Sequence, residues 1–89
     1  MKHTGEMVIT NEFGLHARPA AALVSLANKF QAQVFLIKDD TKVNAKSILG
    51  VLVLAAESGS KVTIEAQGED AEEAVKEIIE FANNRFGTE

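Results

Sequence analysis

The fold of this 89-residue chain is decided by residues 61–87, KVTIEAQGEDAEEAVKEIIEFANNRFG. Apolar and polar side chains alternate strictly over residues 61–67, which predicts a strand with one buried and one solvated face. Apolar residues then recur at helical spacing, which predicts a helix that begins at a capping box of Asp70 and Glu73 and ends at Gly87. The apolar stripe of this helix consists of Val75, Ile78, Ile79, Ala82 and Phe86. Strand and helix therefore share one core.

The remaining residues complete a βαββαβα order of elements. Further strands are predicted at residues 6–10, 33–38 and 41–44, with Asp39-Asp40 as the turn between the last two, and helices at residues 17–29 and 47–54. Met7 and Ile9 share a face of the first strand, and Ser47 is the expected N-cap of the short helix. Because no run of alternating parallel units is present, helices on one side of an antiparallel sheet are the simplest packing. We therefore expect an α+β fold, an open-faced two-layer sandwich with three helices on one face of a four-stranded antiparallel sheet, in a single domain over residues 1–89.

Phe35 and Ile37 are expected to point toward the uncovered face of this sheet. Isolated exposed apolar side chains are normal on protein surfaces, whereas a contiguous apolar patch marks an interface. Scattered surface residues are therefore the commoner interpretation, and a contact between copies of the chain is the alternative.

The composition argues against several classes of protein. Thirteen acidic residues against nine basic ones give a net charge of -4 and a pI near 5.1, which opposes affinity for nucleic acid or an anionic membrane. A small RNA-binding domain would present a basic face with stacking aromatics, whereas this chain has five Phe and neither Tyr nor Trp. Without cysteine there is no disulfide framework or thiolate metal site, and no apolar run suits a signal peptide or membrane span. We expect a cytoplasmic protein that binds no nucleic acid, membrane, metal or cofactor.

The chemistry concentrates in residues 14–20, GLHARPA, where a loop delivers a histidine to the start of a helix. The N–H groups of a first helical turn bind anions, so the backbone N–H groups of Ala17 and Arg18 are expected to bind a phosphoryl group. The same positive field favours the neutral imidazole of His16, whose free ring nitrogen can attack phosphorus. The guanidinium of Arg18 can pair with the phosphoryl oxygens. Taken alone, a histidine at a helix start is more often a cap or a surface residue.

Two motifs together carry a family resemblance. GLHARPA at residues 14–20 resembles the phosphohistidine signature of the HPr family, the phosphocarriers of the phosphoenolpyruvate-dependent phosphotransferase system. KSILGVL at residues 46–52 resembles the family's second signature, around a serine that a dedicated kinase phosphorylates in some bacteria. The resemblance covers essentially the whole chain. It implies that His16 accepts a phosphoryl group on Nδ1 from phospho-enzyme I, with Arg18 as its partner, and passes it to a IIA domain in sugar transport. It also implies a carrier with no independent turnover rather than an enzyme.

The resemblance extends to regulation and partners. Ser47 is the expected regulatory phosphorylation site, and a role as an N-cap only is the alternative. By family position, the docking platform for enzyme I and IIA domains consists of Ala17, Ala21, Ile48, Leu49 and Leu52. Each of these residues could equally belong to the core. HPr kinase/phosphorylase and a transcriptional regulator are further expected partners, and the chain is expected to be a monomer.

The branch of the family stays open. Phe13 occupies a loop position where several members have a small polar residue, so one hydrogen bond to the histidine region is expected to be missing. Ile-Thr-Asn at residues 9–11 and Phe-Gly-Thr-Glu at residues 86–89 resemble the nitrogen-related carriers, whereas Ser47 favours the carriers read by the kinase. A nitrogen-branch regulatory phosphocarrier is therefore one alternative. A regulatory binding module of the same fold, in which the histidine is replaced, is another, and the presence of His16 argues against it.

Overall fold

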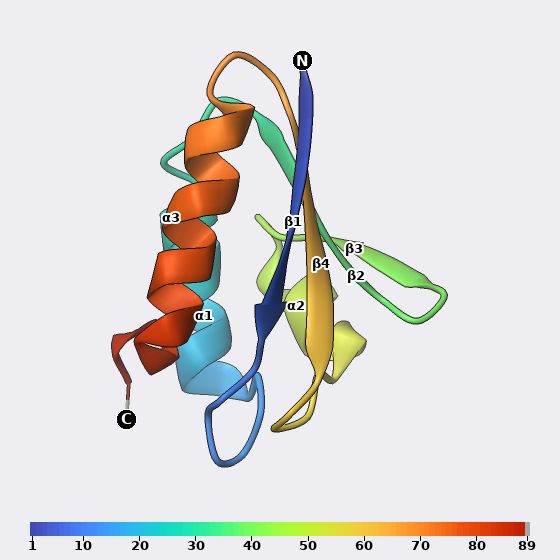
Figure 1. The fold of residues 1–89 in the computed structure, drawn as a ribbon. Helices are drawn as coiled ribbons and strands as arrows, with labels where there is room; N and C mark the ends of the chain where they lie inside the picture. The colour runs from blue at the N-terminus through green and yellow to red at the C-terminus, as the bar shows by residue number, and fades with distance from the viewer. Residues whose placement is uncertain (89) are drawn as a thin grey trace.

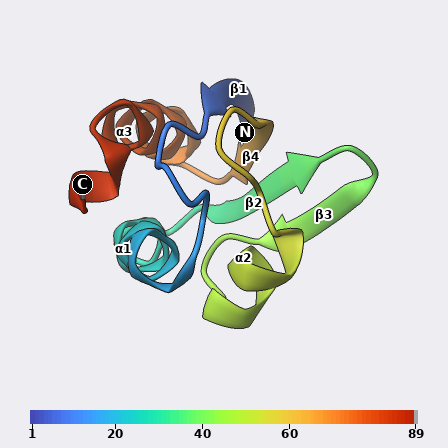
Figure 2. The same ribbon diagram turned by 90° about the horizontal axis from the view of Figure 1, so that it is seen from below.

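The protein is a two-layer sandwich, as seen in a computed structural model that describes residues 1–88 (Figure 1). Its elements are β1 (Lys2–Val8), α1 (Ala17–Ala27), β2 (Gln33–Lys38), β3 (Thr41–Asn44), α2 (Ile48–Leu54), β4 (Lys61–Gln67), α3 (Ala71–Asn83) and the 3-10 turn η1 (Arg85–Gly87). The strands are antiparallel in the order β1-β4-β2-β3, and α1, α2 and α3 lie on one face of the sheet (Figure 2). The predicted α+β sandwich, with three helices on one face of a four-stranded antiparallel sheet, is confirmed. None of the helices that these residues form has the length and apolar character needed to cross a membrane.

β4 is the strand around which the core is built, because it pairs with β1 on one side and β2 on the other. The alternation predicted for it is confirmed, since Val62, Ile64 and Ala66 are fully buried. Apolar side chains of α1 and α3 complete the core, among them Leu23 and Ile78, which are also fully buried. The helices are thus fixed to the sheet by ordinary apolar packing.

The first strand was predicted too late in the chain. The pattern indicated residues 6–10, whereas β1 is Lys2–Val8. One of its inward positions is Gly5, where a Cβ would press against side chains of α3. Close approach of the helix therefore requires a glycine, and this half of the strand carries no apolar signal. Met7 and Ile9 are both buried, as their predicted shared face requires.

The helices α1 and α2 begin where predicted, although α1 is shorter. α1 ends at Ala27 because Asn28 caps it, its Nδ2 donating to the carbonyl of Val24 at 2.9 Å. The predicted N-cap of α2 is confirmed, since Oγ of Ser47 accepts a hydrogen bond from the N–H of Gly50 at 3.2 Å. Both helix boundaries are therefore set by local side-chain hydrogen bonds.

The predicted capping box of α3 is wrong. Asp70 occupies the N-cap position, but its side chain makes no capping hydrogen bond with Glu73 or with the rest of the first turn. Its carboxylate instead accepts hydrogen bonds from the N–H groups of Gln31 and Ala32, both at 2.8 Å. Asp70 therefore ties the start of α3 to the connection between α1 and β2, a long-range contact that competes with the local cap.

The contact of Asp70 makes stability depend on pH. The hydrogen bond from Gln31, more than that from Ala32, holds the pKa of the Asp70 carboxyl below its usual range and outweighs the desolvation that would raise it. A carboxyl with a depressed folded-state pKa stabilises the fold above its unfolded pKa of about 3.9, and this contribution is lost as the pH falls through the lower folded-state pKa. We expect Asp70→Asn to lower the Tm at neutral pH, and the gap from wild type to close below about pH 4. Thermal denaturation across pH measures this gap. Glu72→Gln, which removes an exposed carboxylate of the same turn, is the control, and a gap that stays constant on acidification would contradict the assignment.

The last helix ends before its predicted limit. α3 stops at Asn83, and the positive φ angles of Arg85 and Phe86, 52° and 53°, turn the chain into η1 instead of continuing the helix to Gly87. Phe86 is nevertheless 1% exposed and packs edge-on against Phe81, with ring centroids 5.5 Å apart. The sequence pattern therefore identified Phe86 as buried but assigned it to the wrong element.

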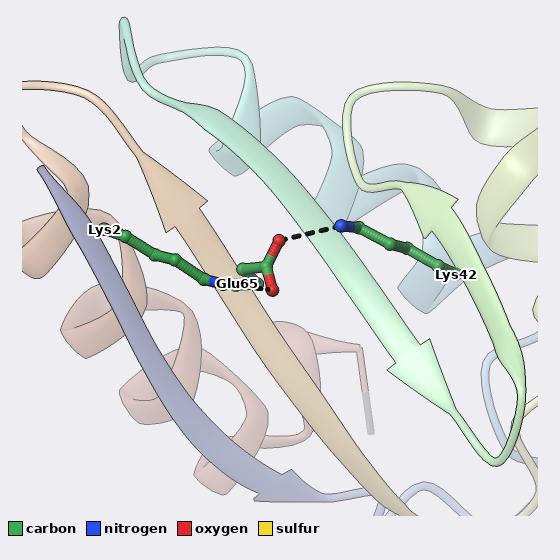
Figure 3. Close-up of polar contacts among 3 residues, drawn as sticks. All are labelled: Lys2, Lys42 and Glu65. Carbon is green, nitrogen blue, oxygen red and sulfur yellow. Dashed lines mark hydrogen bonds and ion pairs between the residues drawn. The ribbon is translucent and has the colours of Figure 1, made fainter.

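The open face of the sheet carries a charged bridge across its strands (Figure 3). Glu65 of β4 lies 3.3 Å from Nζ of Lys2 on β1 and 2.8 Å from Nζ of Lys42 on β3, and the hydrogen bond from Lys42 holds the Glu65 pKa below its usual range. The Lys42 ammonium also lies 4.6 Å from the ring centroid of Phe35. Phe35 and Ile37 are half-buried on this face, which favours scattered surface residues over an apolar contact between copies.

Candidate functional site

A short loop carries the chain from β1 to the histidine at the start of α1. Within it the N–H of Gly14 donates to the carbonyl of Asn11 at 3.0 Å, and the N–H of Leu15 donates to the carbonyl of Ala56 at 2.8 Å. Gly14 has a φ of 73°, and a Cβ on it would overlap the backbone of Ala56. The loop therefore needs glycine at this position, and backbone contacts fix where His16 emerges.

His16 occupies the N-cap position of α1 without capping it. Its backbone is extended, with φ -80° and ψ -170°, and its carbonyl accepts the first helical hydrogen bond from Ala20 at 2.9 Å. The imidazole makes no capping hydrogen bond, so the interpretation of this residue as a side-chain cap is wrong. It is half-buried, and the ring of Phe13 meets it edge-on with centroids 6.1 Å apart. Phe13 therefore supports the histidine by an aromatic contact.

The first turn of α1 supplies backbone donors next to His16. Ala17 and Arg18 are its first residues and are both exposed. A helix leaves the N–H groups of its first turn without intrahelical acceptors, and no acidic residue of α1 lies in that turn to neutralise the positive end of the dipole. The arrangement suits an anion that approaches from solvent.

Within residues 1–88, His16 lines two open hollows. The first, of about 420 Å³, is lined by Glu12, Phe13, His16, Arg18, Arg85 and Thr88. The second, of about 460 Å³, lies against the loop that follows α2 and is lined by Glu12, Phe13, Leu15, His16 and residues 55–58. The structure thus brings His16 and Arg18 together in one open hollow.

Arg85 and Thr88 belong to the first hollow, although the sequence pattern did not reveal them. Both follow α3, and the left-handed backbone at Arg85 is part of the turn that brings this segment beside the start of α1. A pattern that extends the helix to Gly87 places them elsewhere. No local signal could have identified these two residues as neighbours of His16.

An exposed apolar surface, here called the platform, lies on α1 and α2. Its members are Ala17, Ala21, Ile48, Leu49 and Leu52, all predicted as docking residues, together with Val53, which was not. Leu49 is 71% exposed and Ile48 and Leu52 are each 38% exposed, so the alternative that they belong to the core is wrong. Val51 and Leu54 fill the core from the opposite side of α2. Exposed apolar side chains of this kind, on α2 and on the helix that begins next to His16, are suited to contact with another protein.

The chain matches the protein family described as "PTS HPr component phosphorylation site" over residues 3–84. It is 45% identical to the phosphocarrier protein HPr of Cupriavidus necator over 82 residues, which cover 92% of each chain. It is 53% identical to the HPr-like protein Crh of Bacillus subtilis over 68 residues, which cover 76% of this chain and 80% of Crh.

Solved structures give the same relationship. HPr-C-His from Thermoanaerobacter tengcongensis has a TM-score of 0.93 and 44% sequence identity, with 98% of each chain covered. Crh of Bacillus subtilis, whose crystal structure is described as a dimer with a swapped domain, has a TM-score of 0.76 and 48% identity, with 84% of this chain and 86% of Crh covered. Sequence identity at this level over most of each chain shows common family membership and not only a shared fold. The chain therefore belongs to the HPr family, the phosphocarriers of the phosphotransferase system.

Proposed function

We propose that this chain is a cytoplasmic phosphoryl relay of the sugar phosphotransferase system, which accepts a phosphoryl group from phospho-enzyme I on His16 and passes it to IIA domains. The observation that carries the proposal is the open hollow in which His16 and Arg18 lie together at the N-terminus of α1. Membership of a family of phosphocarriers, which have no catalytic turnover of their own, supports it. An open site suits a carrier, because donor and acceptor proteins must reach the same imidazole in turn.

The proposed step needs a nucleophile, an anion site and a cation. The lone pair of Nδ1 of His16 attacks phosphorus and forms a nitrogen–phosphorus bond, while the bond from phosphorus to the donor residue of enzyme I breaks and its electron pair leaves with that residue. The N–H groups of Ala17 and Arg18 and the dipole of α1 stabilise charge on the phosphoryl oxygens. The Arg18 guanidinium adds donors in a fork geometry. The reverse of this step, on a IIA domain, discharges His16.

Reversibility limits how strongly the site can hold its phosphoryl group. Each 1.4 kcal/mol of extra stabilisation, roughly, shifts the transfer equilibrium tenfold. Because the hollow is open, water and dissolved ions screen the charges that line it, and the stabilisation of the bound phosphoryl group stays modest.

Charging followed by a chase tests the relay. Radiolabelled phosphoenolpyruvate and enzyme I should label the protein, and addition of a IIA domain after removal of phosphoenolpyruvate should strip the label from it. A protein that is never labelled contradicts the acceptor role, and one that keeps its label in the presence of cognate IIA domains contradicts the onward transfer.

Arg18→Ala should slow phosphoryl transfer about 10- to 1000-fold, the range expected when one preorganised donor is lost. The fold and the binding of enzyme I should be almost unchanged, because Arg18 is exposed and acts on the transferring group. Rapid-quench measurements of charging and discharging check the rates. Arg18→Lys, which keeps the charge without the fork, should give intermediate rates. Wild-type rates in both directions for Arg18→Ala would show that the helix N-terminus suffices.

Ser47 is proposed as a regulatory phosphorylation site for HPr kinase/phosphorylase. Its Oγ already serves as the N-cap of α2, through the hydrogen bond from Gly50, and the residue is half-buried. The platform begins at the next residue, Ile48. A phosphoryl group of about -1.5 to -2 charge is tolerated at a helix N-terminus, so its effect should fall on docking rather than on the fold.

Ser47→Asp should therefore lower the rate at which enzyme I phosphorylates His16 without lowering the Tm. The carboxylate of the new Asp lies beside the platform and must be desolvated when enzyme I docks. Ser47→Ala should cost about 0.5 to 2 kcal/mol of stability as a lost cap and leave the charging rate near normal. Initial charging rates and urea denaturation of both variants measure these effects. An Asp variant that is charged as fast as wild type would leave Ser47 as a cap only.

A regulatory protein is the second candidate function. The 53% identity over 68 residues to Crh of Bacillus subtilis, which is described as the catabolite repression HPr of that organism, favours it. In this role a transcriptional regulator would bind the protein when Ser47 is phosphorylated. In the nitrogen-related branch, a target protein would instead recognise whether His16 is phosphorylated. Both versions lack onward transfer to a IIA domain of the sugar system. The chase experiment therefore separates the relay from the regulator.

The proposed relay is a monomer, because the platform must be free for enzyme I and IIA domains in turn. The swapped dimer described for Crh is the competing state. Light scattering of the purified protein distinguishes a particle of 9.6 kDa from one of twice that mass.

A further inference from the structure

Arg85 is a second cation in the hollow beside His16, and the proposed transfer step does not use it. The hollow is lined by His16, Arg18 and Arg85, together with Glu12, Phe13 and Thr88. The two arginines come from opposite ends of the sequence, one from the first turn of α1 and the other from the segment that follows α3. Arg85 is thus brought beside the nucleophile His16 from a distant part of the sequence. This placement suggests that Arg85 helps to bind the phosphoryl group that His16 carries.

The backbone around Arg85 is held by a dense set of hydrogen bonds. Its carbonyl accepts from Nδ2 of Asn11 at 3.0 Å, from Oγ1 of Thr88 at 3.0 Å and from the N–H of Thr88 at 3.1 Å. These contacts maintain a left-handed conformation, φ 52°, that residues with side chains rarely adopt. Phe86, which follows, is buried at 1% exposure and fixes the turn to the core. The position of Arg85 is therefore determined by its surroundings rather than by its own preference.

Asn11 connects this turn to the loop that carries His16. Its side chain is fully buried, and its Nδ2 bonds both the Arg85 carbonyl and Oγ1 of Thr88, the latter at 3.1 Å. Its own carbonyl accepts the hydrogen bond from Gly14 that shapes the loop. One buried residue thus fixes the histidine loop and the arginine turn relative to each other.

We propose that Arg85 is a second phosphoryl-binding residue of this site, and that Asn11 is its positioning residue; the proposal deepens, and rests on, the assignment of His16 as the phosphoryl acceptor. In this proposal the Arg85 guanidinium donates to oxygens of the phosphoryl group on His16 within the hollow that both residues line. Glu12 lines the same hollow, so within residues 1–88 the charged side chains that line it beside His16 contribute a net charge of +1, two arginines minus one glutamate. This balance favours binding of the dianionic group without holding it too tightly for onward transfer.

The first arm of the test needs no enzyme I. Potassium phosphoramidate phosphorylates histidine chemically, and the ³¹P resonance of the product reports the pH at which the phosphoryl group loses its last proton. Arg85→Gln should move this midpoint to higher pH than in wild type, because a nearby cation favours the dianion. Arg85→Lys should restore most of the shift. Lys29→Gln, which removes an exposed cation beyond the far end of α1, should leave the midpoint unchanged.

The second arm uses inorganic phosphate with the uncharged protein. Arg85→Gln should raise the Kd for phosphate about two- to fivefold, as expected for the loss of one exposed ion pair. The Kd is measured from the amide shifts of the first turn of α1. Asn11→Ala should raise it similarly in the wild-type background and add nothing in the Arg85→Gln background, because it acts through Arg85. A merely structural role of Asn11 would give additive losses. Thr88→Val provides the same comparison if Asn11→Ala does not fold.

The two arms separate failure of this proposal from failure of the relay. If His16 takes no phosphoryl group in wild type, the acceptor role is wrong, and the phosphate titration alone decides whether Arg85 binds anions. Equal phosphate affinity of wild type and Arg85→Gln, including no measurable affinity in either, would overturn the role of Arg85. An unchanged ³¹P midpoint in a charged Arg85→Gln protein would overturn it as well.

Discussion

His16→Ala is expected to fold as the wild type does and to accept no acid-labile phosphoryl group from phospho-enzyme I. The imidazole is half-buried rather than part of the core, so its loss should cost about 1 kcal/mol of stability, a typical value for a point substitution. Without it, the hollow keeps its cations and the helix N-terminus but loses the imidazole that attacks phosphorus in the proposed step. Intact mass spectrometry at alkaline pH, after incubation with phosphoenolpyruvate and enzyme I, measures the loss.

His3→Ala is the matched control, because His3 is the other of the two histidines in the chain and lies in β1. This variant should be charged at the wild-type rate. A labile phosphoryl group on His16→Ala would contradict the acceptor assignment, and so would loss of charging in a folded His3→Ala protein. Circular dichroism of both variants confirms that any loss of charging is not a loss of fold.

Of the variants proposed here, Gly14→Ala is expected to lower the free energy of unfolding the most. An alanine at the φ of 73° costs about 1 to 2 kcal/mol, and the displaced backbone of Ala56 adds about 1 to 3 kcal/mol, so the total should be roughly 2 to 5 kcal/mol. This is a large share of the roughly 5 to 15 kcal/mol that stabilises a typical domain. The charging rate should fall too, because the shifted loop carries His16 and a misplacement of about 1 Å can cost on the order of 100-fold. Urea denaturation and initial charging rates measure the two effects.

Gly59→Ala separates the two causes in Gly14→Ala. Gly59 also has a positive φ, 90°, but a Cβ there meets no atom within 4 Å. Its replacement should therefore show the conformational cost alone, about 1 to 2 kcal/mol, with a normal charging rate. Equal losses of stability in the two variants would mean that the close approach of Gly14 to Ala56 is not a tight constraint.

Elements whose apolar pattern repeats over several turns or residue pairs were predictable from the sequence. β4 and α3 are each defined by many side chains that face one core, so a local pattern is enough to identify them. The Ser47 cap is also local, since its partner is the N–H of Gly50, three residues later. By contrast, Gly5 hides the first half of β1, because close packing against α3 there requires the absence of a side chain.

What the sequence could not predict depends on contacts between distant segments. Asp70 sits at a helix start but bonds Gln31 and Ala32, because two backbone donors of another connection lie within reach. The same applies to the site. The motif at residues 14–20 places His16 beside Arg18 through one turn of helix, whereas Arg85 reaches the hollow only through the turn after α3 that buried Asn11 stabilises.

The most direct test of the central claim is nuclear magnetic resonance of protein labelled with ¹⁵N in histidine, recorded after charging with phosphoenolpyruvate and enzyme I. We predict phosphorus–nitrogen coupling at Nδ1 of His16 and an unchanged spectrum for the His3 ring. Coupling at another side chain, or a His16 ring that remains unmodified after the reaction is complete, would contradict the account of His16 as the phosphoryl acceptor.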